Sequence, residues 1–318
     1  MTVPTFQGNL HGGLDKAVDQ EVRQVGVWRG TGRNILHQRN ALVGLTILFV
    51  LGMAALFADQ IAQYPPDQVL IGVVDGVKKS SPPCIHVLGC PAEQPQFLMG
   101  TDPNVRDVFS RVVHGARVSL FVGFATVGFA ILIGALIGLV AGYAGGWTDN
   151  FLMRIMDILL VFPALLLAIG IVTAIGQGLL TAQLAIVIVA IPIYARIMRA
   201  AVLSTKENDF VTASRALGES PRGLLFRRIL PNSITPLIVA GTLGIAGAVL
   251  DVAALSFLGL GAQPPMAEWG SMIGQTSDKL FTAPHLILFP GIALTLTVFA
   301  FNLLGDGLRD ALDPRLNR

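Results

Sequence analysis

The sequence has few charged side chains and none of the common catalytic motifs. Asp, Glu, Lys and Arg make up 13% of its 318 residues, whereas soluble domains carry about 25%. It contains no G-x-x-x-x-G-K-[ST] phosphate loop, G-x-S-x-G nucleophile turn, H-E-x-x-H zinc motif or paired C-x-x-C. We therefore expect a membrane protein that is not an enzyme, binds no cofactor or metal itself, and has no nucleic-acid partner.

Cysteine is equally scarce, with only Cys84 and Cys90 in the chain. Both lie in the turn-rich segment SPPCIHVLGCPAEQP. If this segment faces an oxidising compartment, the two residues can form a disulfide that closes a short loop. Two free thiols are an alternative. A metal site that includes His86 is a third, although two Cys and one His leave the usual tetrahedral ligand set incomplete.

Hydrophobic residues make up 53% of the chain and gather in long runs. A helix needs about 20 mostly apolar residues to cross a bilayer, and six runs approach that length. The sequence therefore predicts an all-α membrane protein with six transmembrane helices. They are placed near Ala41–Ala58, Val118–Tyr143, Asp157–Ile175, Gln183–Leu203, Leu237–Phe257 and His285–Leu304.

The distribution of positive charge predicts that both termini are cytoplasmic. With the N-terminus inside, the inner segments hold sixteen Lys and Arg and the outer segments hold six, as the positive-inside rule requires. The first long apolar run begins only at Ala41, so it is interpreted as a retained signal anchor. The resulting units are a cytoplasmic segment 1–40, with 1–20 poorly ordered, an extracytoplasmic loop 59–117, a core 118–304 and a cytoplasmic tail 305–318.

Ionisable residues inside the predicted spans are few. Asp251 lies in the fifth span, past the midplane on the outer side, and Asp157 lies near the inner end of the third. A charge at such depth usually faces a cavity or a partner, so Asp251 and the nearby Ser256 are candidate pore-lining residues. Alternatively, the Asp251 carboxyl is hydrogen-bonded to a neighbouring helix. A single acidic residue argues against a proton-coupled carrier.

Small residues fill the second predicted span. Gly134, Gly138 and Gly142 recur every four residues and form a smooth ridge along one helix face. Such a ridge favours close contact between helices. The contact could be made within this chain or with a second subunit.

A polar, basic loop at 205–236 separates the fourth and fifth spans. Asn208 can cap a short helix, and Gly218 suits its C-terminal end because glycine readily adopts positive φ. One face of this helix is predicted to be apolar, formed by Phe210, Val211, Ala213 and Leu217.

The loop then continues into a second short helix. Ser220 and Pro221 are typical of a cap and a first-turn residue, and Pro231 and Pro236 are expected to end the element. The segment is either an amphipathic helix on the membrane surface or a stiff cytoplasmic lever that docks into a partner.

The lever interpretation is supported by a resemblance to the cytoplasmic loop of ABC importer permeases. Their pattern, E-A-A-x-x-x-G followed by L-P, corresponds here to TASRALG at 212–218 and to Leu230–Pro231. Thr212 and Ser214 depart from Glu and Ala. The resemblance implies contact with an ATPase through Phe210, Ala213, Arg215, Leu217, Gly218, Pro221, Leu230 and Pro231.

Three further segments resemble the dipeptide, oligopeptide and nickel branch of these permeases, and its C-type subunit in particular. The segment GTDPNVRD at 100–107 is similar to GTDxxGRD, with Val105 in place of Gly. Ser110–Arg111 and GARVSL at 115–120 continue it. The outer-loop motif of the branch resembles LSFLGLG at 255–261, followed by Pro264–Pro265 and Trp269–Gly270. Its C-terminal end resembles NLLGDGLRD at 302–310, followed by Asp313-Pro314-Arg315. Residues at about 65–98 resemble an insert.

The resemblance implies a permease subunit of an ATP-driven importer in a bacterial or archaeal cell membrane. It implies a heterodimer with a second, related permease, two cytoplasmic ATPase subunits that bind ATP and Mg, and an extracytoplasmic solute-binding protein. Peptides are the expected substrate; nickel chelates, glutathione or another small solute are alternatives. A channel or ion-coupled carrier would need pore rings of charge or a buried relay, which the sequence lacks, and a membrane scaffold would not need the full set of motifs.

Overall fold

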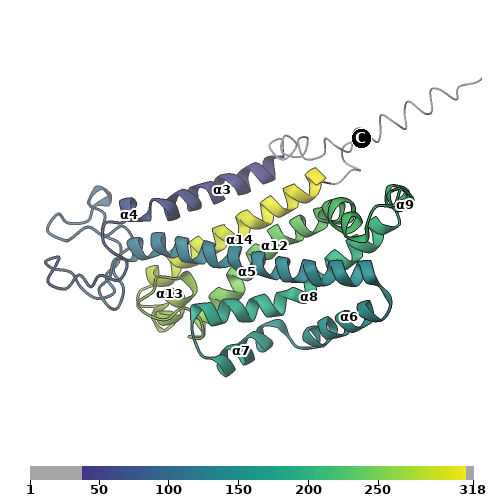
Figure 1. The fold of residues 1–318 in the computed structure, drawn as a ribbon. Helices are drawn as coiled ribbons and strands as arrows, with labels where there is room; N and C mark the ends of the chain where they lie inside the picture. Colours follow the sequence, from purple (N-terminus) through teal and green to yellow (C-terminus); the bar gives the residue numbers. More distant parts are fainter. Residues whose placement is uncertain (1–37, 313–318) are drawn as a thin grey trace, which may run out of the picture.

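The computed structural model describes residues 38–312, and its regular secondary structure is helical apart from isolated bridges (Figure 1). Five of the described helices are long and apolar enough to span a membrane. They are α3 (Arg39–Leu56), α5 (Val108–Ala144), α8 (Leu179–Lys206), α12 (Thr235–Phe257) and α14 (His285–Leu312). Most of the predicted segment 1–40, including 1–20, and the end of the 305–318 tail lie outside the described residues.

The third predicted span is wrong as a single helix. The structure has two helices there, α6 (Gly146–Val161) and α7 (Ala164–Ile175), and the chain bends by 91° between them. Pro163 causes the break, because it has no N–H to donate and forces the preceding residue out of the helical region. Phe162 accordingly has φ −83° and ψ 138°. A sixth span exists only if this bent pair counts as one.

The second span begins ten residues before its predicted start at Val118. Asp107 caps α5, because its carboxylate accepts hydrogen bonds from the Ser110 N–H at 2.8 Å and from the Ser110 hydroxyl at 2.5 Å. This early start carries the helix well into the predicted outer loop. The capped end places Ser110 and Arg111, which continue the GTD motif, on a rigid element.

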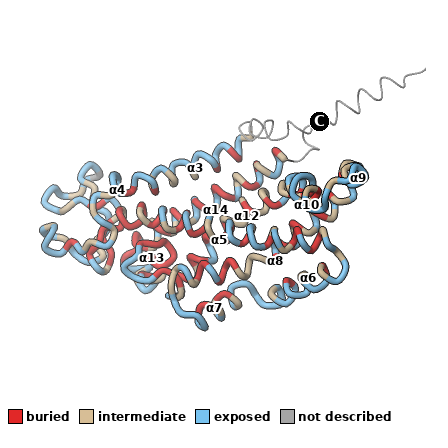
Figure 2. Tube along the Cα trace, in the orientation of Figure 1, coloured by how far each residue is buried: buried red, intermediate tan, exposed pale blue. Residues whose placement is uncertain are grey.

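The glycine ridge of α5 packs against α8 within this chain. A Cβ added at Gly138 would lie 2.2 Å from the carbonyl oxygen of Ala195, and one at Gly134 would lie 2.8 Å from that of Ile191. Only glycine allows the two backbones to approach so closely. Buried residues accordingly concentrate where α5, α8, α12 and α14 face one another (Figure 2).

The remaining elements lie at the two ends of the helices. One end carries the irregular segment after α4 (Ala58–Ile61), with the short η2 (His86–Leu88), and also α13 (Trp269–Gln275) and η4 (Ser277–Lys279). The other end carries α9 (Asp209–Ala216), α10 (Pro221–Gly223), η3 (Leu224–Ile229) and α11 (Leu230–Ser233). These two ends hold the candidate functional features (Figure 1).

Candidate functional site

The loop between α8 and α12 forms a helix–turn–helix. Asn208 takes the extended N-cap conformation before α9, with φ −74° and ψ 146°, but its side chain makes no capping hydrogen bond. The end of α9 matches the sequence prediction: Gly218 has φ +82°. The Gly218 N–H donates to the Arg215 carbonyl and the Glu219 N–H to the Ser214 carbonyl, the pair of bonds that defines a Schellman motif.

The predicted apolar face of α9 is divided between the protein interior and the surface. Val211 is fully buried and Phe210 is half-buried against the same cluster, so this side attaches α9 to the rest of the chain. Ala213 and Arg215 are exposed, and Leu217 is 88% exposed. A leucine this exposed at the tip of a rigid loop is available to a partner.

The second half of the loop is more continuous than the sequence predicts. Ser220 caps α10 through a 3.2 Å hydrogen bond from the Gly223 N–H, and Pro221 occupies the first turn. Helical structure then runs through the π-helical η3 into α11. Pro231 and Pro236 do not end the element: each lies in the first turn of a helix, α11 and α12, where the missing N–H costs no hydrogen bond.

Buried contacts fix this loop to the transmembrane core. Leu224 and Ile229 are buried in the same cluster as residues of α5 and α8, and Leu230 packs against it. The buried Ser233 hydroxyl donates to Thr205 at 2.9 Å, which joins α11 to the end of α8. Packed side chains therefore connect α9 with α8 and α12.

Two ion pairs connect α6 to α8 near the same end. Arg199 makes two bonds to the Asp149 carboxylate, at 2.5 and 2.6 Å. Arg196 pairs with Asp157 at 2.5 Å, and both of these side chains are about half exposed. Asp157 is thus an ion-pair partner of α8.

The two candidate pore-lining residues occupy different environments. Asp251 is exposed on α12, and among the described residues it forms neither an ion pair nor a side-chain hydrogen bond. Ser256 is only 2% exposed, and its hydroxyl accepts a 3.1 Å hydrogen bond from the Ala262 N–H. The Ser256 hydroxyl thus stabilises the turn after α12, and a pore-lining role for Ser256 stays a prediction.

The GTD motif folds into a turn organised by the buried Asp102. Its carboxylate accepts hydrogen bonds from the N–H groups of Asn104 and Arg106, each at 2.8 Å, and from the Arg106 guanidinium at 2.6 Å. The Arg111 guanidinium lies 3.7 Å away. In the sequence these residues form only a motif. Charged residues among apolar neighbours were the signal that could have predicted a buried ion pair.

Arg111 links this turn to segments far away in the sequence. It is 1% exposed, and its guanidinium donates to the carbonyls of Pro66 at 2.8 Å and Pro265 at 3.2 Å. One side chain thus holds the start of the outer loop, the GTD turn and the loop before α13 together.

Glu268, which the sequence analysis also missed, positions α13. The side chain is 2% exposed and accepts hydrogen bonds from the N–H groups of Gly270 at 2.9 Å and Ser271 at 2.8 Å. Burial raises the pKa of the Glu268 carboxyl, and these N–H groups counteract part of that rise. Trp269 is fully buried beside it and donates to the Val112 carbonyl at 2.9 Å.

The segment 65–98 has a small core of its own, which includes part of the GTD motif. Leu70, Phe97 and Val105 form a buried cluster. Val105, which replaces the Gly of the related pattern, has φ +58°, a conformation that disfavours a β-branched residue. Burial of its side chain among the apolar groups of this segment offsets that cost.

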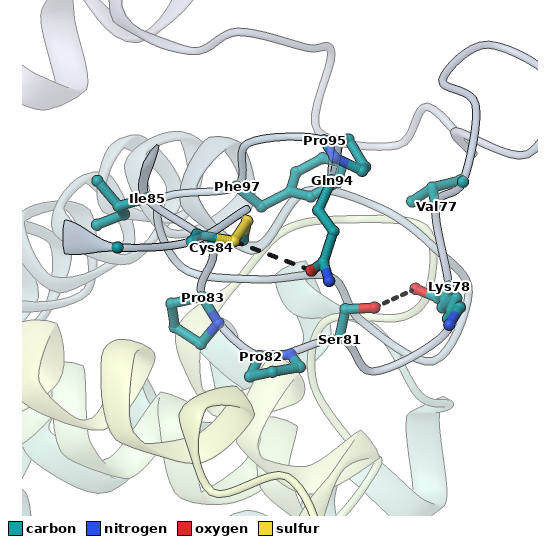
Figure 3. A pocket seen from close by; sticks show the side chains of 13 residues that line it. Val77, Lys78, Ser81, Pro82, Pro83, Cys84, Ile85, Gln94, Pro95 and Phe97 are labelled. Atoms are coloured by element: carbon teal, nitrogen blue, oxygen red, sulfur yellow. Dashed lines mark hydrogen bonds between the residues drawn. A yellow bond between two sulfur atoms is a disulfide. The ribbon is translucent and has the colours of Figure 1, made fainter. Parts of the chain in front are cut away.

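Cys84 and Cys90 are joined by a disulfide in this segment, with their Cα atoms 5.4 Å apart. Backbone hydrogen bonds of 2.9 Å in both directions pair Cys84 with Phe97. The two residues lie beside a hollow of about 570 Å³ that Lys78, Pro83 and Gln94 also line (Figure 3). In the part of the chain that the structure describes, no group of His, Cys, Asp and Glu could hold a metal.

Comparison with known proteins shows similarity to transport permeases. Residues 134–318 match the family described as binding-protein-dependent transport system inner membrane component, and residues 26–83 match the N-terminal TM domain of oligopeptide transport permease C. The chain is 43% identical to the di/tripeptide transport system permease protein DppC of Pseudomonas aeruginosa, over 89% of this chain and 91% of that one.

Other relatives carry related names. The glutathione transport system permease protein GsiD of Pectobacterium atrosepticum is 45% identical over 69% of this chain and 72% of its own. A chain from inward-facing structures of the MetNI methionine ABC transporter shares the fold, with a TM-score of 0.54 and 21% identity, over 64% of this chain and 97% of that chain. This chain belongs to the binding-protein-dependent transport system inner membrane component family, and within it resembles the C-type peptide permeases.

Proposed function

We propose that this chain is one of two different permease subunits of an ATP-driven importer of di- or oligopeptides. In this assignment it forms half of the translocation pathway, and the bent α6–α7 pair is the third of six spans. Both termini are cytoplasmic. Relatives named as di/tripeptide and dipeptide transport permeases support peptides as the substrate class, and a solute-binding protein would deliver them from outside.

The observation that carries this proposal is the geometry of the α9 loop. Its tip is rigid, because the Schellman motif fixes the end of α9, and Leu217 is almost fully exposed there. Its base is packed against α8, and the hydrogen bond from Ser233 to Thr205 joins α11 to the end of α8. Closure of two cytoplasmic ATPases around ATP would move this loop and rock the attached helices, which exposes the pathway to alternate sides.

Asp251 completes the proposal on the pathway side. A carboxylate in a spanning helix is costly against lipid, so the exposed face of α12 that carries it is assigned to the pathway or to the second permease. The positively charged amino terminus of a peptide is a chemically suitable partner.

Transport by the reconstituted complex tests the proposal. Gly218→Val forces a β-branched residue to φ +82°, where each such residue costs about 1–2 kcal/mol, and is expected to reduce peptide uptake by at least tenfold while the complex still assembles. Gly52→Val is the control, because Gly52 lies in α3, has no positive φ, and a Cβ there meets open space. Asp251→Asn is expected to raise the KM for peptides with a free amino terminus. Unchanged uptake and unchanged peptide-stimulated ATPase activity in Gly218→Val would refute the coupling role.

Glutathione is the second candidate substrate, because two relatives are named glutathione permeases. A competition assay decides between the two. Excess unlabelled dipeptide or excess glutathione is added to the vesicles while uptake of a labelled peptide is measured. The solute that blocks this uptake at the lower concentration is the preferred substrate. If neither competes, the substrate assignment fails while the coupling assignment stands.

A further inference from the structure

The outer end of α5 holds the start of the outer loop through a row of polar side chains. The Ser110 hydroxyl accepts a hydrogen bond from the Tyr64 N–H at 3.3 Å, and the Arg111 guanidinium donates to the Pro66 carbonyl at 2.8 Å. These two bonds fix the chain that follows α4. The bonds to α4 itself come from two residues further along α5.

Arg117 is the first of these two residues, and its contribution does not depend on pH. Its Nε–H donates to the Ala55 carbonyl at 3.0 Å, and a terminal nitrogen donates to the Leu56 carbonyl and to the Asp59 carboxylate, each at 3.2 Å. A guanidinium keeps its charge at every physiological pH. This part of the contact between α5 and the α3–α4 segment is therefore permanent.

His114 is the second, and each of its two ring nitrogens faces an acceptor oxygen. Nδ1 lies 2.8 Å from the Ser110 carbonyl oxygen, and Nε2 lies 3.1 Å from Oδ1 of Asp59. A backbone carbonyl can only accept. Hydrogen bonds from the His114 ring and from Arg117 hold the pKa of the Asp59 carboxyl below its usual value, so Oδ1 is also an acceptor. Both ring nitrogens must therefore carry a proton for the two bonds to exist together.

The neutral His114 ring cannot make both bonds. It has one N–H group, so its other nitrogen presents a lone pair to an oxygen. The Ser110 carbonyl is fixed within α5, whereas the Asp59 side chain is 65% exposed and is able to turn towards water. Loss of the ring proton therefore breaks the bond between His114 and Asp59.

The other ionisable groups on this side of α5 form different bonds. Asp67 lines a hollow of about 560 Å³ beside His114 but forms no ion pair among the described residues. Burial raises the pKa of the Asp107 and Glu268 carboxyls, and both accept hydrogen bonds from the first turns of their own helices, α5 and α13. Arg111 donates to carbonyls. Because histidine changes its charge between pH 5 and 8, His114 is the group that makes the α4 contact sensitive to pH.

We propose that a proton on His114 closes a latch between α4 and α5, so that acidification of the outer compartment tightens the start of the outer loop on α5. When the ring loses its proton, Asp59 keeps only its bond to Arg117. The latch rests on the proposed function only through the outward placement of this end of the molecule. Neither the transported solute nor the coupling to ATPases enters it.

The latch acts where apolar packing is weakest. In its most apolar stretch α3 is 17% buried, the lowest value among the five long apolar helices that the structure describes. The short α4 follows it directly, and only Ala58 of α4 is buried. Side-chain hydrogen bonds from α5 therefore carry much of the attachment of α4 (Figure 1).

Electron paramagnetic resonance of the reconstituted complex tests the proposal. A spin label is attached at Gln60→Cys, an exposed position of α4. Because Cys84 and Cys90 are joined in a disulfide, this is the only free thiol of the chain. An exposed pair of this kind changes an equilibrium by about two- to fivefold, so the mobile fraction of the label should be about threefold larger at pH 8 than at pH 5.5.

Two variants should remove this pH dependence in opposite directions. His114→Leu has no donor and should leave α4 mobile at both pH values. Asp59→Asn offers an amide N–H to the neutral Nε2 while Nδ1–H keeps its bond to Ser110, so α4 should stay held at pH 8. His86→Leu is the matched control, because His86 lies in the same outer loop and bonds to the Gln94 carbonyl instead; the pH dependence should persist in it.

Two results would overturn the proposal. The first is equal mobility of the label at pH 5.5 and pH 8 in the otherwise natural chain. The second is a pH dependence that survives in Asp59→Asn, which remains informative if His114→Leu fails to fold and which would assign the response to Asp107 or Glu268. The pH is also changed on one side of the vesicle at a time. A response from the side that labels Leu217→Cys would refute the orientation in the proposed function while leaving the latch intact.

Discussion

The buried carboxylate of Asp102 should contribute strongly to the stability of the outer end of the molecule. Asp102, Arg106 and Arg111 are 6%, 5% and 1% exposed. Asp102→Asn keeps the shape of the side chain and one oxygen for the two backbone N–H groups. It replaces the oxygen that faces the Arg106 guanidinium with an NH₂ group, so that donors face donors.

The loss of stability follows from the two buried guanidinium groups that the variant leaves without a carboxylate. The variant loses a charge-assisted hydrogen bond of 2.6 Å, and the two buried guanidinium groups lose the carboxylate that lies between them. Removal of one partner from a buried ion pair costs about 3–5 kcal/mol. An unfolding entropy of about 2.1 cal/mol/K per residue gives about 1.5 °C per kcal/mol for 318 residues, so the unfolding midpoint should fall by roughly 4–8 °C.

Thermal unfolding in detergent, followed by tryptophan fluorescence, measures this change. Asp75→Asn is the control, because Asp75 is an exposed carboxyl in the same outer loop and forms no ion pair within the described residues; its effect should stay within about 0.5 kcal/mol. The double variant Asp102→Asn/Arg106→Met should recover part of the loss, since it removes both members of one pair. A midpoint for Asp102→Asn within 2 °C of the control would refute the reasoning.

Two further predictions concern the outer end. Burial raises the pKa of Glu268 in the folded chain. The protonated carboxyl therefore contributes its full stability below the pKa of the unfolded chain, about 4.3. This contribution is lost as pH rises through the pKa of the folded chain. The unfolding midpoint of Glu268→Gln, measured from pH 4 to 8, should therefore rise relative to the natural chain as pH increases; parallel curves would contradict this. Cys84 and Cys90 should resist thiol labelling in chain isolated without reductant and react after reduction, as the disulfide in the structure requires; labelling without reductant would contradict it.

The sequence predicted the long apolar helices because hydrophobic runs of sufficient length have few other stable arrangements. It also predicted local features that depend on residues close in sequence, such as the positive φ of Gly218 and the cap at Ser220. The bend at Phe162 and Pro163 was not predicted, because a proline in a span can be accommodated by a kink or by a complete break. Neighbouring helices decide between the two.

The functional residues divide in the same way. The sequence by itself determined that a rigid, basic loop lies between two spans, because caps, prolines and a helix-ending glycine act over a few residues. Only the tertiary structure decided which side of α9 is exposed and that Ser256 is buried. Only it revealed that Arg111 bonds to carbonyls 45 and 154 residues away, since the partners of a buried charge are selected by helix packing and not by spacing along the chain.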